Sequence, residues 1–219
     1  VPRLMYADAA SPLTLDGVCP GHLLTLGAEE SRHAAKVLRL RTGDEVELID
    51  GMGHLMRGLV ADVGARRTMR IEAIDAAEFH PRPAKQPSVH ALVACTTLQG
   101  ARADMMIEKL SELGVTSFTP VLCERSSRAA RRERWQRVTV SAQKQCLRLH
   151  ALELREAVTV DGFVESLSTP ARESSSGGSH RRTQILLAKQ GAHPISDWIA
   201  SRMKVEEDNV DYVVVVGAQ

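Results

Sequence analysis

The chain has 219 residues, 43% of them apolar, so it is long enough to bury a hydrophobic core in one large domain or two small ones. Its 28 lysines and arginines nearly balance its 27 aspartates and glutamates, which excludes a strongly basic protein and requires any nucleic-acid-binding surface to be local. The four cysteines lack the spacing of a metal site, so we expect no metal site and reduced, mostly buried thiols. No long apolar run or secretory signal occurs, so we expect no membrane span.

The first third of the chain carries short runs in which apolar and polar residues alternate between glycine turns. Three runs show this best: residues 46–49, 58–61 and 69–74. Alternation with a period of two is typical of β-strands, so we expect a small β-rich domain over residues 1–78. One helix is expected within it, over residues 29–40. Three of its apolar side chains should face the core: Ala34, Val37 and Leu38.

A proline-rich segment, residues 79–87, predicts an extended linker. Beyond it, over residues 88–219, apolar runs alternate with helical spacings. Four runs are expected to be strands: residues 89–95, 118–123, 185–188 and 212–216. Strands that alternate with helices are typical of a parallel sheet covered on both faces, so the second region is predicted to be an α/β domain.

The segment after the first of these strands predicts a helix that ends at Gly114. Met106, Leu110 and Leu113 are spaced to form its buried stripe, and Arg102 and Lys109 lie on another face. Periodicity alone favours a packing helix with solvated charges.

The residues of this helix are more specific than their spacing. Arg102, Lys109 and the run Glu112-Leu113-Gly114-Val115 resemble a signature of the RsmE family of 16S-type ribosomal RNA uridine-N3 methyltransferases, which belongs to the SPOUT class. Other segments agree with that family in order and spacing: Val37-Leu38-Arg39-Leu40 with Gly43-Asp44, Pro120 with Glu124-Arg125-Ser126, and Arg134-Trp135 with Ala142, Gln145 and Arg148. The similarity covers about residues 30–217.

The resemblance implies a PUA-like β-barrel over residues 1–78 that helps to bind RNA, and a SPOUT methyltransferase domain of the α/β-knot type over residues 88–219. In that family S-adenosylmethionine lies in the knotted crevice at the carboxyl ends of the strands, where ligands of open α/β sheets bind. The resemblance therefore assigns Ala188, Lys189 and Gly217 to the first part of a cofactor site.

The end of the chain departs from the family. Residues 215–219 align with the start of a Gly-Pro-Glu-Gly-Gly loop, but Ala218 and Gln219 stand in place of Pro and Glu. We expect the rest of the knot to lie beyond Gln219. Gln99 also stands close to where the family usually has a lysine.

Methyl transfer to uridine N3 requires the imide to lose a proton while the methyl donor is held in line with the nitrogen. An arginine beside a uracil carbonyl would stabilise the resulting anion through charge-assisted hydrogen bonds. Arg102, Arg125 and Arg148 are therefore the candidate catalytic residues. For Arg125, a simple ion pair with Glu124 at a strand end is an alternative.

Residues 124–137 hold six arginines against two acids, the strongest local positive cluster in the chain. The predicted RNA-binding residues are Arg39, Arg128, Arg131, Arg132 and Gln145. Phosphate contacts made by such residues would give salt-dependent binding. The alternatives are a solvated face for the arginine cluster and, for Gln145 and Arg148, which we expect one turn apart on one helix, a structural hydrogen-bonded pair.

Taken with the resemblance, these residues predict a cytoplasmic enzyme, or one of an organellar matrix in a eukaryote, that methylates uridine N3 in small-subunit ribosomal RNA with S-adenosylmethionine. We expect a homodimer whose partner is ribosomal RNA or the small ribosomal subunit. The alternative is a non-catalytic RNA-binding or ribosome-assembly protein that kept the fold but lost the cofactor loop, which Ala218 and Gln219 favour. An unrelated nucleotide-using enzyme is disfavoured because no phosphate-binding loop occurs.

Overall fold

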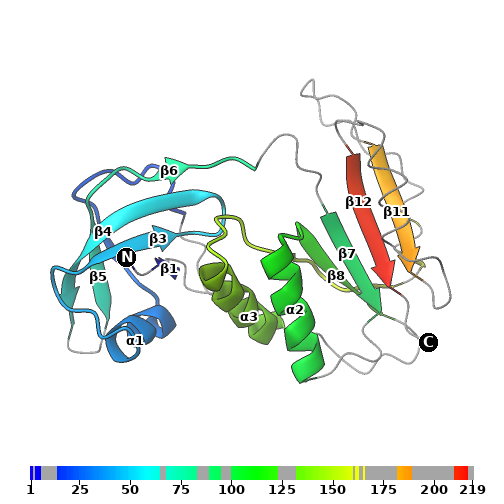
Figure 1. Ribbon diagram of the computed structural model, residues 1–219, viewed down its shortest axis with the longest axis horizontal. Helices are drawn as coiled ribbons and strands as arrows, with labels where there is room; N and C mark the ends of the chain where they lie inside the picture. The colour runs from blue at the N-terminus through cyan, green and yellow to red at the C-terminus, as the bar shows by residue number, and fades with distance from the viewer. Residues whose placement is uncertain are drawn as a thin grey trace. The chain divides into compact units, whose positions relative to one another are not determined.

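A computed structural model describes residues 1, 3–5, 14–64, 68–82, 89–94, 100–122, 132–159, 161–162, 165, 182–188 and 210–216. The chain divides into two compact units (Figure 1). The first comprises Val1–Arg82 with Glu133–Ala151, and the second comprises Pro83–Arg132 with Leu152–Gln219. This division differs from the predicted one, because residues 133–151 belong with the first unit rather than with the α/β domain.

The described residues of the first unit form β1 (Arg3–Met5), β2 (Leu23–Thr25), α1 (Ala28–Lys36), β3 (Glu45–Ile49), β4 (His54–Val63), β5 (Met69–Ala73), β6 (Glu78–Phe79) and α3 (Arg132–Gln145), whose first residue is assigned to the second unit. Its sheet has the order β1-β3-β4-β5-β2, with β6 paired to β4. All pairings are antiparallel except that of β1 with β3. The three alternating runs are confirmed as β3, β4 and β5.

The core of this unit follows from that alternation. In β5 the odd residues Met69, Ile71 and Ala73 are buried, and Arg70 and Glu72 are exposed. The same face receives buried side chains from the neighbouring strands and loops, among them Leu15, Leu26, Val46, Leu48, Met56 and Val60. Burial of this apolar surface is the main favourable term in the folding of the unit.

Helix α1 is shorter than predicted. Ala34 is fully buried as expected, but Val37 is 66% exposed and Leu38 is 37% exposed, so these two inward positions were wrong. The reason is the way the helix ends: the Leu38 amide bonds back to the His33 carbonyl, and Arg39 adopts a left-handed φ of 56°. Val37 is thus the C-cap of the helix and the chain leaves the helical path after it, and neither Val37 nor Leu38 joins the buried face that Ala34 belongs to.

The predicted linker also begins too early. Phe79 lies in β6, and the His80 amide donates to the Gly53 carbonyl at 2.8 Å, so residues 79–82 are held by the first unit. Residues 83–87 lie outside the described residues.

The described residues of the second unit form β7 (Val89–Ala94), α2 (Ala101–Leu113), β8 (Ser117–Leu122), β9 (Glu153–Leu154), β10 (Val158–Thr159), β11 (Arg182–Ala188) and β12 (Val210–Val216). The sheet order is β10-β8-β7-β12-β11, with β9 paired to β8, and every pairing is parallel. This confirms the α/β fold with a parallel sheet. The predicted knot falls at the C-terminal end of this unit, on residues outside the described ones.

Two further expectations concerned membrane-spanning segments and the burial of the thiols. Within the described residues, no helix is both long and apolar enough to cross a membrane. Cys19 is exposed and Cys146 is half-buried, so the expectation of mostly buried thiols was wrong for Cys19. Cys95 and Cys123 lie outside the described residues.

Candidate functional site at the carboxyl edge of the parallel sheet

The carboxyl ends of four strands lie level at one edge of the second unit. Val216, the last residue of β12, pairs with Ala188 of β11 on one side and with Val93 of β7 on the other. Ala94, the last residue of β7, pairs with Val121 of β8. Figure 1 shows the arrowheads of these strands pointing the same way. The four strands therefore end side by side.

Ligands of open α/β sheets bind outside the carboxyl ends of the strands. Strands β7 and β12 are neighbours in the sheet although they lie far apart in the chain, so this edge brings distant segments together. The edge formed by the four strand ends is thus the expected place for a ligand.

Of the three predicted cofactor-binding residues, Ala188 is the one that the structure describes. Ala188 is the last residue of β11, and its backbone pairs with Val216. Lys189 and Gly217, which directly follow β11 and β12, lie outside the described residues, as does Arg125 after β8.

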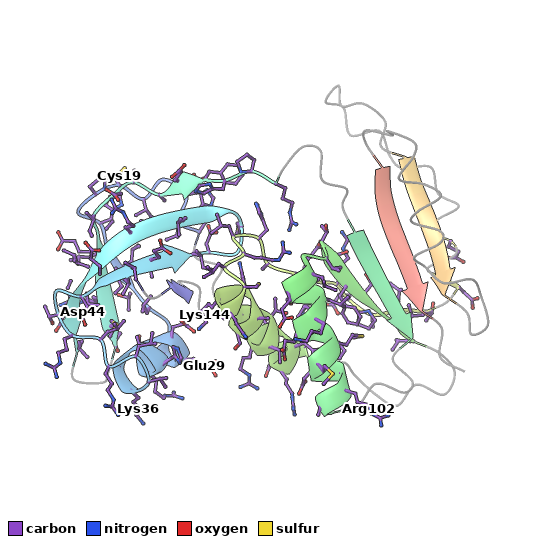
Figure 2. All side chains as sticks on the ribbon, viewed as in Figure 1. Cys19, Glu29, Lys36, Asp44, Arg102 and Lys144 are labelled. Atoms are coloured by element: carbon purple, nitrogen blue, oxygen red, sulfur yellow. The ribbon has the colours of Figure 1, made fainter. Side chains whose placement is uncertain are left out.

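Arg102 is brought to the same edge because α2 follows β7. It occupies the second position of α2, is exposed, and projects from the N-terminal end of that helix in Figure 2. Gly100 precedes the helix with a φ of 59°, a conformation that glycine adopts without strain. The first turn of a helix has unpaired backbone N–H groups and a partial positive charge, so this end attracts anions even without the guanidinium.

The buried stripe of α2 differs from the predicted one. The buried residues are Ala103, Ile107 and Ser111, and Leu113 is 76% exposed. Ser111 can be buried because its hydroxyl donates to the Ile107 carbonyl at 2.8 Å, which satisfies the donor within the helix. The helix is thus rotated from the orientation that apolar spacing alone predicts.

Lys109 of α2 is exposed and lies between two carboxylates. Its Nζ donates to Glu112 at 2.8 Å and to Glu108 at 3.1 Å. Hydrogen bonding to Glu112, and then to Glu108, raises the pKa of Lys109, and the same bond to Lys109 lowers the pKa of Glu112. The positive charge of Lys109 is therefore compensated by two carboxylates of its own helix, which disfavours a role in binding phosphate.

Arg148 and Gln145 belong to the first unit rather than to the unit that contains this edge. Gln145 is the last residue of α3 and is exposed. Leu147 has a left-handed φ of 57°, so the chain has left the helix before Arg148 and the predicted spacing of one helical turn was wrong. The Arg148 amide instead donates to the Gln143 carbonyl at 3.2 Å.

The remaining predicted RNA-binding residues are only partly described. Arg39 is exposed in the segment after α1. Arg132, at the start of α3, is exposed and forms an ion pair with Glu156. Arg134 and Arg137 of the same cluster are also exposed, whereas Arg128 and Arg131 lie outside the described residues.

The structure adds a group of residues that sequence reasoning did not select. The Asp50 side chain is fully buried and accepts hydrogen bonds from the His54 imidazole at 2.6 Å and from the Met52 amide at 2.8 Å. His150, from the segment after α3, approaches the same turn. The glycines at positions 51 and 53 indicated a turn, but nothing in the sequence indicated which distant segment would pack on it.

No cluster in the described part of the chain has the composition of a metal site.

Two family models match the chain. A model described as an RNA methyltransferase domain matches residues 84–218, and one described as an RNA methyltransferase PUA domain matches residues 26–67. Ribosomal RNA small subunit methyltransferase E from Synechocystis sp. is 27% identical over 150 residues, which is 67% of this chain. The chain spans about half the length of that relative, 47%.

Solved structures resemble the fold over nearly its whole length. Ribosomal RNA small subunit methyltransferase E from Neisseria gonorrhoeae, bound to S-adenosyl methionine, has a TM-score of 0.69 at 21% identity, with 99% of this chain and 78% of that chain covered. A Legionella pneumophila protein classed as a methyltransferase, in complex with its bound cofactor SAM, has a TM-score of 0.67 at 19% identity, with 99% and 88% covered. At these identities the likeness establishes the fold.

Proposed function

The chain belongs to the RNA methyltransferase family whose domain model it matches, and from this premise we propose that it transfers a methyl group from S-adenosylmethionine to uridine N3 in small-subunit ribosomal RNA. The observation that carries the proposal is the level carboxyl edge of β8, β7, β12 and β11, with Arg102 in the helix turn that follows β7. The ribosomal RNA methyltransferase from Synechocystis and the cofactor-bound structures support the substrate and the cofactor.

The residues at the edge fit the cofactor. Strands β7 and β11, which flank β12, both end in alanine, Ala94 and Ala188. Small residues at strand ends let a ligand come close to the backbone, and backbone N–H and C=O groups are the usual partners of an adenine edge and an amino-acid moiety. We therefore assign Ala188, Lys189 and Gly217 to the cofactor. When bound, S-adenosylmethionine supplies a methyl group on a positively charged sulfur.

The chain's own contribution is to bind uridine and to favour loss of its N3 proton. We assign this to arginines, because a guanidinium stays charged and can donate charge-assisted hydrogen bonds to a carbonyl oxygen on which negative charge develops. Arg102 has the best described position for the role, since the N-terminus of α2 adds its partial charge to that of the side chain. Arg125 and Arg148 are the further candidates.

RNA binding is assigned to both units. Residues 26–67 of the first unit match the PUA domain model, and the unit carries Arg39 and Gln145 at exposed positions. The arginine cluster of residues 125–137 continues at the start of α3. We further propose that the protein acts as a homodimer in the cytoplasm, or in an organellar matrix if its host is a eukaryote. Light scattering of the complete protein that gave a monomer mass would contradict the dimer.

The test is methylation by the complete protein. Small ribosomal subunits that lack the modification are incubated with S-adenosylmethionine labelled in its methyl group, and the RNA is digested to nucleosides for mass spectrometry. We expect labelled 3-methyluridine. RNA that is bound but carries no label would instead favour the non-catalytic assembly protein, and label on another base would contradict the uridine assignment.

A matched pair of variants then tests Arg102. Arg102→Ala should slow single-turnover methylation by about 10²–10³-fold, the loss typical of removing one donor to a developing oxyanion. Arg70→Ala makes the same change of charge at an exposed arginine that is paired with Asp62 in the first unit, and should leave the rate unchanged. Equal rates for Arg102→Ala and the wild type would remove Arg102 from the catalytic residues.

A further inference from the structure

The chain turns sharply between α3 and Arg148. Leu147 adopts a φ of 57°, a left-handed conformation that is strained for a residue with a side chain. Such a conformation persists only where the surrounding structure holds it. The neighbouring segments must therefore hold the turn over residues 145–148, which carries Gln145 and Arg148.

The first anchor lies immediately before the turn. Lys144, the penultimate residue of α3, donates to Glu30 of α1 at 2.5 Å, and their side chains are only 17% and 12% exposed. Figure 2 shows Lys144 on the side of α3 that faces α1. A pair that is largely withdrawn from water resists breakage, because removing one partner leaves the other charge buried and uncompensated.

The second anchor lies immediately after the turn. The Gly53 amide donates to the Leu149 carbonyl at 3.0 Å, and the Ala151 amide donates to the Gly51 carbonyl at 2.8 Å. These two bonds form an antiparallel bridge between residues 149–151 and the turn that joins β3 to β4, residues 50–53. The segment that follows Arg148 is thus attached to the first unit by its backbone.

His150 closes this anchor. Its Nε2 lies 2.8 Å from the His80 carbonyl, and because a carbonyl can only accept, Nε2 carries the proton. Burial is the main cause that lowers the pKa of His150, and the nearby Arg82 and His54 lower it further, against the His80 carbonyl and Asp50, which raise it. The imidazole is therefore neutral near pH 7 and acts as a fixed hydrogen-bond donor.

Two glycines of the 50–53 turn leave the space that residues 150–151 occupy. A Cβ at Gly53 would lie 2.6 Å from Cε1 of His150 and 2.8 Å from the His80 carbonyl oxygen, and Gly53 has a φ of 111°. A Cβ at Gly51 would lie 3.1 Å from Cβ of Ala151. The buried Asp50 carboxylate fixes the turn from within by accepting the amides of Met52 and His54.

We infer that His150 and the 50–53 turn are positioning elements for Arg148. They hold the backbone on the C-terminal side of Arg148, and the Lys144–Glu30 pair holds the N-terminal side of the turn. The inference rests on the proposed role of Arg148 in methyl transfer. A displacement of about 1 Å in a catalytic group can slow a reaction by about 10²-fold, which is the reason to expect an effect on rate.

The test is a mutant cycle in the complete protein, measured by single-turnover methylation at saturating RNA and cofactor. His150→Ala removes the donor and should slow methylation by about 10–100-fold while RNA affinity stays within about twofold. His150→Gln places an amide N–H where Nε2 lies and should recover the rate to within about threefold. Arg148→Ala combined with His150→Ala should be as slow as Arg148→Ala alone, because His150 acts only through Arg148.

Several outcomes would overturn the inference. These are a wild-type rate for His150→Ala, an equal loss in His150→Gln and His150→Ala, or losses that multiply in the double variant. If Arg148→Ala keeps the wild-type rate, the proposed role of Arg148 fails, and so does the claim that His150 acts on catalysis.

Amide hydrogen exchange separates the structural half of the claim from the proposed function. Without any substrate, His150→Ala should speed exchange at the amides of Gly53, Ala151 and Arg148 by at least about tenfold, and His150→Gln should not. Unchanged exchange at these three amides in a folded His150→Ala protein would contradict the positioning role, whatever the protein methylates.

Discussion

Asp50 has a buried side chain whose hydrogen-bonding capacity is filled at both oxygens. Each oxygen accepts hydrogen bonds: Oδ1 from the amides of Met52 and His54, and Oδ2 from the Leu15 amide at 3.2 Å and the His54 imidazole at 2.6 Å. A carboxylate accepts at both oxygens, whereas the amide of asparagine must present a donor at one of them. The site is therefore selective for aspartate.

We predict that Asp50→Asn lowers the free energy of unfolding by about 1–3 kcal/mol, because buried donors lose their acceptor. The matched control is Asp75→Asn. Asp75 pairs with Arg57 at 2.6 Å, but both side chains are exposed, so the loss there should be below about 1 kcal/mol. Urea denaturation of the two variants measures the difference, and equal losses would show that the Asp50 network contributes no more than a surface pair.

Single residues were predicted unevenly. Arg102 could be placed, because a residue at the start of a helix that follows a parallel strand must lie near the carboxyl edge of the sheet. The glycines at 51 and 53 predicted a turn, which the structure confirms, but not its contact with His150, since the two segments are separated by nearly a hundred residues and share no periodic pattern. Arg148 was expected on α3, but the left-handed Leu147 ends the helix without a glycine or proline to signal it.

Among the elements, strands were predicted better than helices. Alternation in β3, β4 and β5 identified each strand, because successive side chains of a strand point to opposite faces. Helices α1 and α2 were located, but their buried faces were partly wrong: Val37 and Leu38 lie beyond the end of α1, and α2 buries Ala103 and Ser111 in place of Leu113. Small residues bury little surface, so a pattern of large apolar residues does not reveal them.

Helix α1 is joined to the sheet by one buried hydroxyl. Ser31 Oγ donates to the Leu26 carbonyl at 3.0 Å and accepts from the Met69 amide at 3.1 Å, and Ser31 is fully buried. It therefore links the helix to the start of β5 and to the loop before α1.

We predict that Ser31→Ala lowers the free energy of unfolding by about 1–3 kcal/mol, because the buried Met69 amide is left without an acceptor. Arg32→Ala, the neighbouring exposed position of the same helix, should change it by less than about 0.5 kcal/mol. Thermal unfolding followed by circular dichroism compares the two, and an Arg32→Ala loss as large as that of Ser31→Ala would contradict this role for the hydroxyl.

At the scale of the molecule, the order of patterns along the chain predicted a β-rich region followed by a parallel α/β sheet, and both were confirmed. What the order could not predict is that residues 133–151 would join the first unit, because a helix in an α/β pattern is expected to cover the sheet that it follows. Here two backbone hydrogen bonds, one at Leu149 and one at Ala151, attach residues 149–151 to the 50–53 turn and so to the first unit.

The near-neutral net charge means that RNA affinity must come from local groups. Arg134 and Arg137 are exposed on α3. We predict that replacing both by alanine weakens RNA binding and reduces the slope of log affinity against log salt by about 1.5, as expected for two lost phosphate contacts.

The control is Arg57→Ala combined with Arg70→Ala. These two arginines are exposed and paired with aspartates, and their loss should leave the slope unchanged. Filter binding over a range of salt concentrations measures both, and an unchanged slope for the α3 variant would assign the cluster to a solvated face.

The central claim is that the carboxyl edge of the parallel sheet binds the methyl donor. Hydrogen exchange of the complete protein, with and without S-adenosylmethionine, tests it most directly. We predict slower exchange in the segments that follow β7, β11 and β12, including the first turn of α2, with no change in β3, β4 or β5. Protection confined to the first unit, or no protection at saturating S-adenosylmethionine, would contradict the claim.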